Sequence, residues 1–277
     1  MTFDPEQLGR STHELAVMLR TLRKRAGLSG DRLAARCNMS QSKVSRIESG
    51  RVRPSLVDLE QILRAVDAPP DTVAEVNTLA RIANTEWRNT RDLRRKGLDS
   101  RQAELKSLET SSTEMRYFLL SMITGLLATP EYARASLAHS PADTRKAVAG
   151  KLERQKILCN TSKNFHFLLT EQAVRWPVVG PLALAEQIDR LTSLTYLPNV
   201  RLGVIPTGTP TPTTPMNTFT VYDATLATVE TLTGSLVLRD GRDVRSCLEA
   251  FSGYEECALF GERARAKLAE WSAACRS

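Results

Sequence analysis

The sequence is poor in the residues that build metal and redox centres. Its 277 residues include only five cysteines and three histidines, all widely spaced, with no CxxC pair and no Cys/His ligand spacing. An odd number of scattered cysteines favours reduced thiols over disulfides or a zinc site. We therefore expect no cofactor, no metal and no histidine-based catalytic centre.

Long apolar runs are also missing. No stretch approaches the roughly 18 apolar residues of a membrane-spanning helix, so no membrane association is expected. The first ten residues carry Asp4 and Glu6 and no apolar core, unlike a secretory signal. The sequence thus predicts a cytoplasmic protein, and its length suggests about two domains at roughly 150 residues each.

The positive charge is concentrated in the first third of the chain. The whole sequence has 38 basic and 31 acidic residues, but residues 10–66 alone hold 12 basic against 5 acidic. Residues 67–86 are acidic, residues 88–96 are basic again, and residues 99–277 are almost neutral with 20 against 19. A concentrated basic region favours a polyanionic partner, whereas the neutral remainder favours a protein or ligand partner.

The basic region has the pattern of four short helices. Apolar residues recur at helical spacing in the first, at Leu15, Met18, Leu19, Leu22 and Ala26. Gly27 is a typical C-terminal stop, and Ser29 and Ser40 are typical N-caps of the next two helices. Residues 37–39 predict the turn between those two, and Ser55 with Asp58 forms a capping box for the fourth.

The third helix, residues 41–48, has two chemically different faces. Val44 and Ile47 point to the core, while the opposite face carries an amide, two hydroxyls and a guanidinium, from Gln41, Ser42, Ser45 and Arg46. Glutamine can read adenine, arginine can read guanine, and serine can bond to several bases in the major groove. We expect these four side chains to contact DNA, with the flanking Lys43, Arg51 and Arg53 neutralising phosphates. The alternative is a small helical bundle with a polar surface.

Residues 39–63, MSQSKVSRIESGRVRPSLVDLEQIL, resemble the helix-turn-helix of the XRE/Cro family of transcriptional regulators. The resemblance implies that this helix binds operator DNA and that proteins of this kind act as homodimers on half-sites about 34–36 Å apart. It also implies a structural ion pair between Arg23 and Glu48. The second helix departs from the family, since Gly30 and Asp31 stand where a glutamine usually contacts the DNA backbone. Arg32 is then expected to supply that contact.

Pro69 and Pro70 end the first domain, and residues 71–96 have a helical pattern with five residues facing inward, namely Val73, Val76, Ala80, Ala83 and Trp87. Trp87 is expected to be a packing anchor between domains. The basic end of this segment, from Arg88 to Lys96, fits either a solvated helix end or a second phosphate-contacting surface. The predicted domains are thus a helix-turn-helix over 10–68, a helical connector over 69–100, and a third region over 101–277.

Residues 101–277 mix helical and strand patterns. Helices are expected over 101–121, 130–137, 141–159, 181–196, 242–257 and 259–274, and strands over 165–169, 200–205, 219–222, 228–231 and 236–238. The predicted fold class is therefore an all-α helix-turn-helix domain followed by a helical connector and an α+β domain with a small mixed sheet. The Pro/Thr-rich segment 206–215 between two strands is either a functional lid or an inert connection.

Seven segments of this region resemble the WhiJ-like regulators of actinobacteria, namely 108–109, 123–135, 154–155, 169–175, 199–206, 219–223 and 229–230. The resemblance implies a second domain that senses an effector or holds a small partner protein encoded nearby, an arrangement likened to antitoxin–toxin pairs. Candidate ligand- or partner-binding residues are the polar groups at predicted strand ends, Glu171, Arg175, Tyr222 and Glu230. Each is alternatively a satisfied structural polar group.

The sequence as a whole predicts a sequence-specific transcription regulator that binds double-stranded operator DNA as a homodimer. The alternative is an antitoxin-like protein that neutralises a small partner and regulates its own operon. A carboxylate pair of Glu171 and Glu230 is conceivable, but no spacing selects these acids, so the protein is not expected to be an enzyme.

Overall fold

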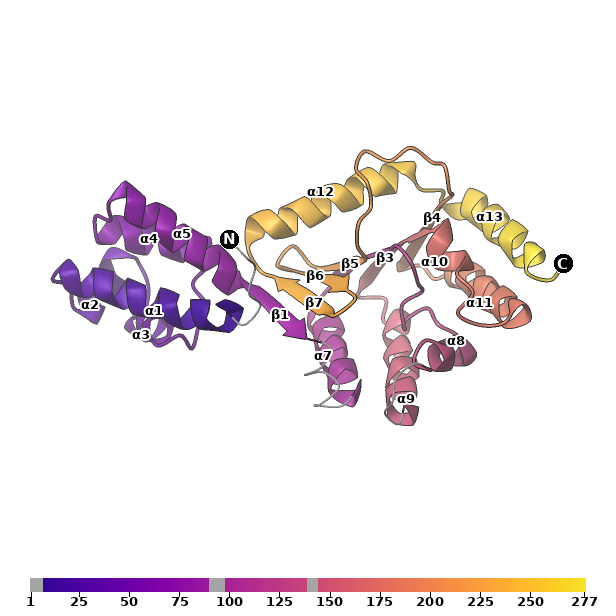
Figure 1. Cartoon of the computed structure of the whole chain (residues 1–277), viewed down its shortest axis with the longest axis horizontal. Helices are drawn as coiled ribbons and strands as arrows, with labels where there is room; N and C mark the ends of the chain where they lie inside the picture. Colours follow the sequence, from indigo (N-terminus) through magenta and orange to yellow (C-terminus); the bar gives the residue numbers. More distant parts are fainter. Residues whose placement is uncertain (1–6, 90–97, 139–143) are drawn as a thin grey trace. The chain divides into compact units, whose positions relative to one another are not determined.

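The computed structural model describes residues 7–89, 98–138 and 144–277. The chain divides into two compact units (Figure 1). The first comprises Met1–Trp87 with Leu236–Asp243, and the second comprises Arg88–Ser235 with Val244–Ser277.

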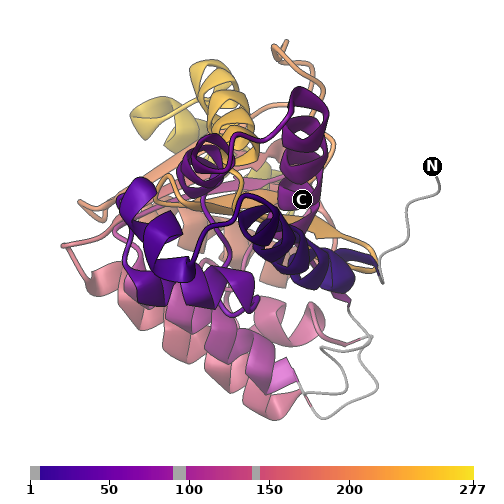
Figure 2. The ribbon, with the colours of Figure 1, turned by 90° about the vertical axis from the view of Figure 1, so that its left-hand side faces the viewer.

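The first unit is built from helices, drawn in indigo to purple in Figure 2. They are α1 (Gln7–Arg25), α2 (Gly30–Arg36), α3 (Gln41–Glu48), α4 (Leu56–Ala65) and α5 (Pro70–Asn84). The expected caps are present, because the hydroxyls of Ser29, Ser40 and Ser55 each accept a hydrogen bond from a backbone N–H in the first helical turn. Asn38 closes the turn between α2 and α3 with a left-handed φ of 50°, which asparagine tolerates better than most residues.

The core of this unit includes a helix that sequence reasoning had assigned to the connector. Leu15 and Leu19 of α1 are almost fully buried together with Val76, Ala80 and Ala83 of α5. Burial of the α5 face makes this helix the fifth element of the helix-turn-helix unit.

The helix predicted over residues 71–96 is shorter than expected. It ends at Asn84, and Thr85–Asn89 form the strand β1. Threonine and tryptophan favour strands, but five residues are too few to separate the two periodicities. The basic residues of segment 90–97 and the side chain of Trp87 lie outside the described residues.

The second unit contains the strands β2 (Glu114–Leu119), β3 (Asn164–Thr170), β4 (Val200–Ile205), β5 (Phe219–Tyr222) and β6 (Leu226–Thr231). Its helices are α7 (Leu98–Ser111), α8 (Pro130–Ala135), α9 (Arg145–Arg154), the 3-10 helix η1 (Gln155–Cys159), α10 (Glu171–Arg175), α11 (Pro181–Leu194) and α13 (Gly261–Ala274). The unit boundaries at residues 235–236 and 243–244 fall within the strand β7 (Gly234–Leu238) and the helix α12 (Gly241–Cys257), and most of α12 belongs to the second unit.

The sheet is mixed, with the strand order β1-β7-β6-β5-β2-β3-β4. Strands β2, β3 and β4 are parallel, while β5 is antiparallel to both β2 and β6. Helices cover both faces: α12 lies above the sheet in Figure 1, and α7 and α9 lie below it. Tyr254 of α12 stacks on Phe118 of β2, and Glu109 of α7 reaches the neighbouring Tyr117 from the other side.

The predicted α+β class is confirmed, but the central strand β2 was predicted as helix. The helix expected over 101–121 ends at Ser111, and residues 114–119 form β2. The alternation of polar and apolar residues in β2 covers only Glu114–Tyr117 and gives way to the buried Phe118 and Leu119, so the pattern is too short to separate a strand from the helix that precedes it.

Candidate nucleic-acid interface

The recognition helix α3 is fixed by its buried side. Val44 and Ile47 are each 1% exposed and lie within the core of the first unit. At about 100° per residue, these two define a narrow stripe; Ser42, Ser45 and Arg46 fall on the opposite arc, and Gln41 lies at its edge. The helix therefore presents one polar arc outward.

The residues of that arc are all exposed, as base-reading residues must be. Gln41, Ser42, Ser45 and Arg46 are accessible to solvent. Hydrogen bonds among them are local: the Arg46 Nε donates to the Ser42 carbonyl at 3.2 Å, and the Ser42 hydroxyl lies 3.1 Å from that of Ser40. Amide, hydroxyl and guanidinium groups thus share one accessible surface.

An ion pair holds the C-terminal end of α3 to α1, as the family resemblance implied. Arg23 donates to both carboxylate oxygens of Glu48, at 2.6 and 2.8 Å, and to the carbonyl of Leu28 at 2.8 Å. The hydrogen bond to Glu48 raises the pKa of Arg23 above its ordinary value, against the opposing effect of burial. Bidentate pairing of this kind fixes orientation as well as distance.

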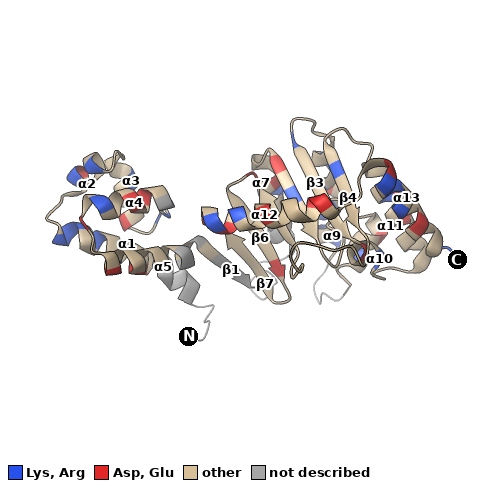
Figure 3. Ribbon diagram, turned by 90° about the horizontal axis from the view of Figure 1, so that it is seen from above, with Lys and Arg blue, Asp and Glu red and all other residues tan. Residues whose placement is uncertain are grey.

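The expected phosphate-neutralising residues differ in their surroundings. Arg51 and Arg32 are exposed, and Arg53 is half-buried. Lys43 instead donates to Asp58 of α4 at 2.7 Å. Figure 3 shows that basic residues gather on α1, α2 and α3.

Sequence reasoning missed Asp58 as a neighbour of the recognition helix. Its spacing from Ser55 identified a capping box, which the structure contains, but nothing in that spacing pointed to Lys43. Burial raises the pKa of Asp58, yet the hydrogen bonds from Lys43 and Ser55 outweigh it and leave the pKa below its ordinary value. This carboxylate is therefore charged at neutral pH.

A surface hollow of about 310 Å³ lies among α1, α2 and α3. Arg20, Gly30, Gln41 and Ser45 are among the residues that line it. A Cβ at Gly30 would lie 3.8 Å from the Gln41 Nε2, an ordinary contact distance. The missing side chain at Gly30 therefore leaves open space beside Gln41.

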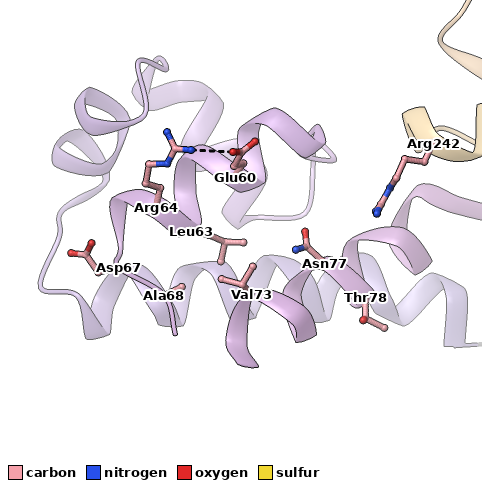
Figure 4. Close-up of a pocket in the computed structure, with 9 residues that line it drawn as sticks. All are labelled: Glu60, Leu63, Arg64, Asp67, Ala68, Val73, Asn77, Thr78 and Arg242. Atoms are coloured by element: carbon pink, nitrogen blue, oxygen red, sulfur yellow. Dashed lines mark hydrogen bonds and ion pairs between the residues drawn. The ribbon is translucent and has the colours of Figure 1, made fainter. Parts of the chain in front are cut away.

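A second hollow adjoins α4 and α5 (Figure 4). Leu63, Ala68 and Val73 contribute apolar groups, and Glu60 and Arg64 form an exposed ion pair at 3.0 Å. No residue that the sequence singled out for DNA or ligand binding lines it.

Two of the candidate ligand residues in the second unit are paired with each other. Glu171 accepts from Arg175 at 2.6 Å and from the backbone N–H of Thr207 at 3.0 Å. Burial raises the pKa of Glu171, but the hydrogen bonds from Thr207 and Arg175 outweigh it and lower the pKa.

The other two candidates lie elsewhere in the sheet. Tyr222 is 2% exposed and pairs with Met115 near the start of β2, whereas Glu171 follows the end of β3. Burial raises the pKa of Tyr222, with a further contribution from Glu109. Glu230 is half-buried on β6, which β5 and β2 separate from β3, and three strand spacings amount to about 14 Å. The four residues therefore do not form one site.

The structure offers no cluster of potential metal ligands within residues 7–89, 98–138 and 144–277. Among those same residues, no helix is long and apolar enough to span a membrane.

A capped polar recognition helix, joined by a tight turn to a supporting helix, defines a protein of the helix-turn-helix class. The comparisons agree, because residues 14–76 match a family described as a helix-turn-helix domain. Residues 102–270 match the family described as a domain of unknown function, DUF5753. This second match covers more than half of the chain, so the protein belongs to that family.

Two solved structures show weak similarity. A phospholipase D family member, Nuc from Salmonella typhimurium, aligns with 58% of this chain and 90% of its own at 8% identity, with a TM-score of 0.34. TrmBL2, described as an archaeal chromatin protein with a novel mode of DNA binding, aligns with 64% of this chain and 53% of its own at 12% identity, with a TM-score of 0.30. Neither likeness identifies a shared fold. No curated protein matches the sequence.

Proposed function

We propose that this protein is a sequence-specific transcription regulator that binds double-stranded operator DNA through α3. The carrying observation is the exposed arc of Gln41, Ser42, Ser45 and Arg46 on a helix whose opposite stripe is buried. These side chains are free to meet base edges in the major groove, and the exposed Arg32 and Arg51 are available to phosphates.

The family resemblance supports the finer assignment. It supports an XRE-type regulator of the WhiJ-like group that acts as a homodimer, with a second unit that binds a small effector or a small partner protein. A binding role fits better than catalysis, because Glu171 is already engaged by Arg175 and Thr207 and is remote from Glu230.

The test is in vitro selection from random duplexes, followed by mobility-shift titration of variants. Gln41→Ala and Arg46→Ala should each weaken binding to the selected duplex by about 1–3 kcal/mol and relax one base position. Arg51→Ala should weaken binding to all sequences alike. The control is Gln61→Ala, which removes the same side chain from an exposed position on α4.

Equal, sequence-independent losses for Gln41→Ala and Arg46→Ala would contradict base reading. A pull-down with the full chain tests the second unit: a retained small molecule would support effector sensing, and a stoichiometric short protein would identify the antitoxin-like role.

A further inference from the structure

Lys43 is the only lysine of α3, and its ammonium group is already bound within the protein. The Nζ lies 2.7 Å from Oδ1 of Asp58, whose side chain is 9% exposed, while that of Lys43 is 38% exposed. A charge-assisted hydrogen bond to a mostly buried carboxylate is stronger than an exposed pair. Arg51, by contrast, is exposed to solvent.

Asp58 is itself held in place. Its Oδ2 accepts the backbone N–H of Ser55 at 3.0 Å, and its own N–H donates to the Ser55 hydroxyl at 3.1 Å. One carboxylate therefore closes the first turn of α4 and binds α3 at the same time. Because the capping box fixes this carboxylate, it provides a rigid anchor for Lys43.

The Lys43–Asp58 pair lies on one side of the buried Val44/Ile47 stripe of α3. Lys43 and Glu48 are five residues apart, which is about 140° around a helix, and the buried Ile47 and Val44 fall between them. The Glu48–Arg23 pair thus flanks one side of the buried stripe, and the Lys43–Asp58 pair flanks the other. Two ion pairs on opposite sides of the stripe resist rotation of α3 about its own axis.

We propose that Asp58 is a positioning residue for DNA recognition. Its carboxylate holds the ammonium group of Lys43 in an ion pair between α3 and α4, so that Lys43 does not contact a phosphate. This ion pair fixes the angle at which Gln41 and Arg46 meet the base pairs. The inference rests on the proposed function, since it concerns the same interface.

The salt dependence of DNA binding separates the two roles of Lys43. Each phosphate contact contributes about 0.9 to the slope of log affinity against log salt concentration. With the full chain and a random-sequence duplex, Lys43→Gln should leave the slope unchanged, whereas Arg51→Gln should reduce it by about 0.9. Lys43→Gln should nevertheless lower the ratio of affinities for selected and random duplexes, by about tenfold, comparable to one lost base contact.

Asp58→Asn provides the reciprocal test. Asparagine keeps an oxygen for the Ser55 amide but releases the ammonium of Lys43, so the slope should increase by about 0.9 while the selected-to-random ratio falls. Glu60→Gln is the matched control, because it removes the same charge from an exposed carboxylate of α4, which pairs with Arg64 at 3.0 Å. It should change neither quantity.

A slope that falls by the same amount in Lys43→Gln and Arg51→Gln would overturn the inference, because Lys43 would then contact a phosphate. A wild-type chain that binds neither duplex would refute the proposed function instead. In that case the Lys43–Asp58 ion pair is tested by denaturation of Lys43→Gln, Asp58→Asn and the double variant. Non-additive shifts of the denaturation midpoint support the pair, and additive shifts refute it.

Discussion

Two residues of the sequence motifs in the second unit form a buried ion pair. Arg154 donates to both carboxylate oxygens of Glu109, and its third nitrogen donates to Gln102 at 2.6 Å. Both side chains are at most 4% exposed, and the hydroxyl of Tyr117 also contacts Glu109. Removal of one partner would leave the other charge buried without compensation, so these motif residues have a structural role.

The Arg23–Glu48 pair is the corresponding single-residue test in the first unit. The two side chains are 13% and 11% exposed, so Glu48→Ala leaves a guanidinium largely buried and should destabilise the first unit by about 3 kcal/mol. Hydrogen exchange of α1 and α3 amides measures this loss. The exposed Glu60→Ala should cost below about 0.5 kcal/mol, and equal losses in both variants would contradict the assignment.

His166 gives the second unit a dependence on pH. Burial lowers the pKa of His166 below its ordinary 6.5; Arg116 and Arg201 act in the same direction, while Glu114 and Glu255 oppose them. The unfolded chain therefore binds the proton more readily, and stability is lost as the pH falls below about 6.5.

Thermal unfolding at pH 7.5 and 5.5 tests this expectation. His166→Gln should lose less stability between the two pH values than the wild type does. His13→Gln, at an exposed position of α1, should behave like the wild type. A His166→Gln profile parallel to that of the wild type would show that another group titrates.

At the scale of elements, the Pro/Thr-rich loop is anchored along its length. Thr207 donates its N–H to Glu171, Thr213 bonds to the hydroxyl of Tyr254, and Thr218 accepts the N–H of Leu120. Between these anchors, Pro212 packs on Gly253 of α12, where a Cβ would lie 2.7 Å from the proline Cγ. Of the two roles left open by the sequence, a functional lid and an inert connection, these contacts favour the inert connection.

Gly253→Ala should therefore displace the loop and destabilise the second unit by about 1–3 kcal/mol through overpacking. Hydrogen exchange and limited proteolysis over residues 206–218 report the displacement. Adding Pro212→Ala removes the clashing Cγ and should restore protection. Gly241→Ala is the control, because nothing lies within 4 Å of a Cβ there; loss of protection in that variant too would point to a general effect on α12.

The turn over residues 125–127, which follows β2, is also held by hydrogen bonds from side chains distant in the sequence. Gln155 donates to the carbonyls of Gly125 and Ala128, both at 2.8 Å, and Arg190 donates to Leu127 at 3.1 Å and to Gln155 at 2.7 Å. The family resemblance identified both the turn and Gln155, but their contact across some 30 residues is a property of the fold.

The sequence predicted those elements whose conformation is determined by neighbouring residues, and missed those determined by contacts with distant parts of the chain. The caps at Ser29, Ser40 and Ser55 and the stripe of Val44 and Ile47 arise from neighbouring residues, so α2, α3 and α4 were predicted correctly. By contrast, β2 owes its conformation to burial between β3 and β5. For the same reason the partner of Lys43, 15 positions away, and the separation of Tyr222 from Glu171 emerged only from the three-dimensional arrangement.

At the scale of the whole molecule, the uneven charge predicts how DNA binding responds to salt. If Arg32, Arg51 and Arg53 of each chain in a homodimer meet phosphates, six contacts give a log–log slope of about −5. Fluorescence anisotropy between 50 and 200 mM salt measures the slope, and sedimentation measures two chains per operator. A slope near half this value with one chain bound would refute the dimer.

The exposed arc of α3 can accept substitutions that the buried side of the helix cannot. Ser45 lies opposite the buried stripe and Gln41 at the edge of the exposed arc, and neither takes part in the two ion pairs that anchor the helix. Substitutions at these positions should scarcely affect folding. Under the proposed function, the preferred operator can therefore drift in evolution, or be reprogrammed by design, while the scaffold that presents the arc stays the same.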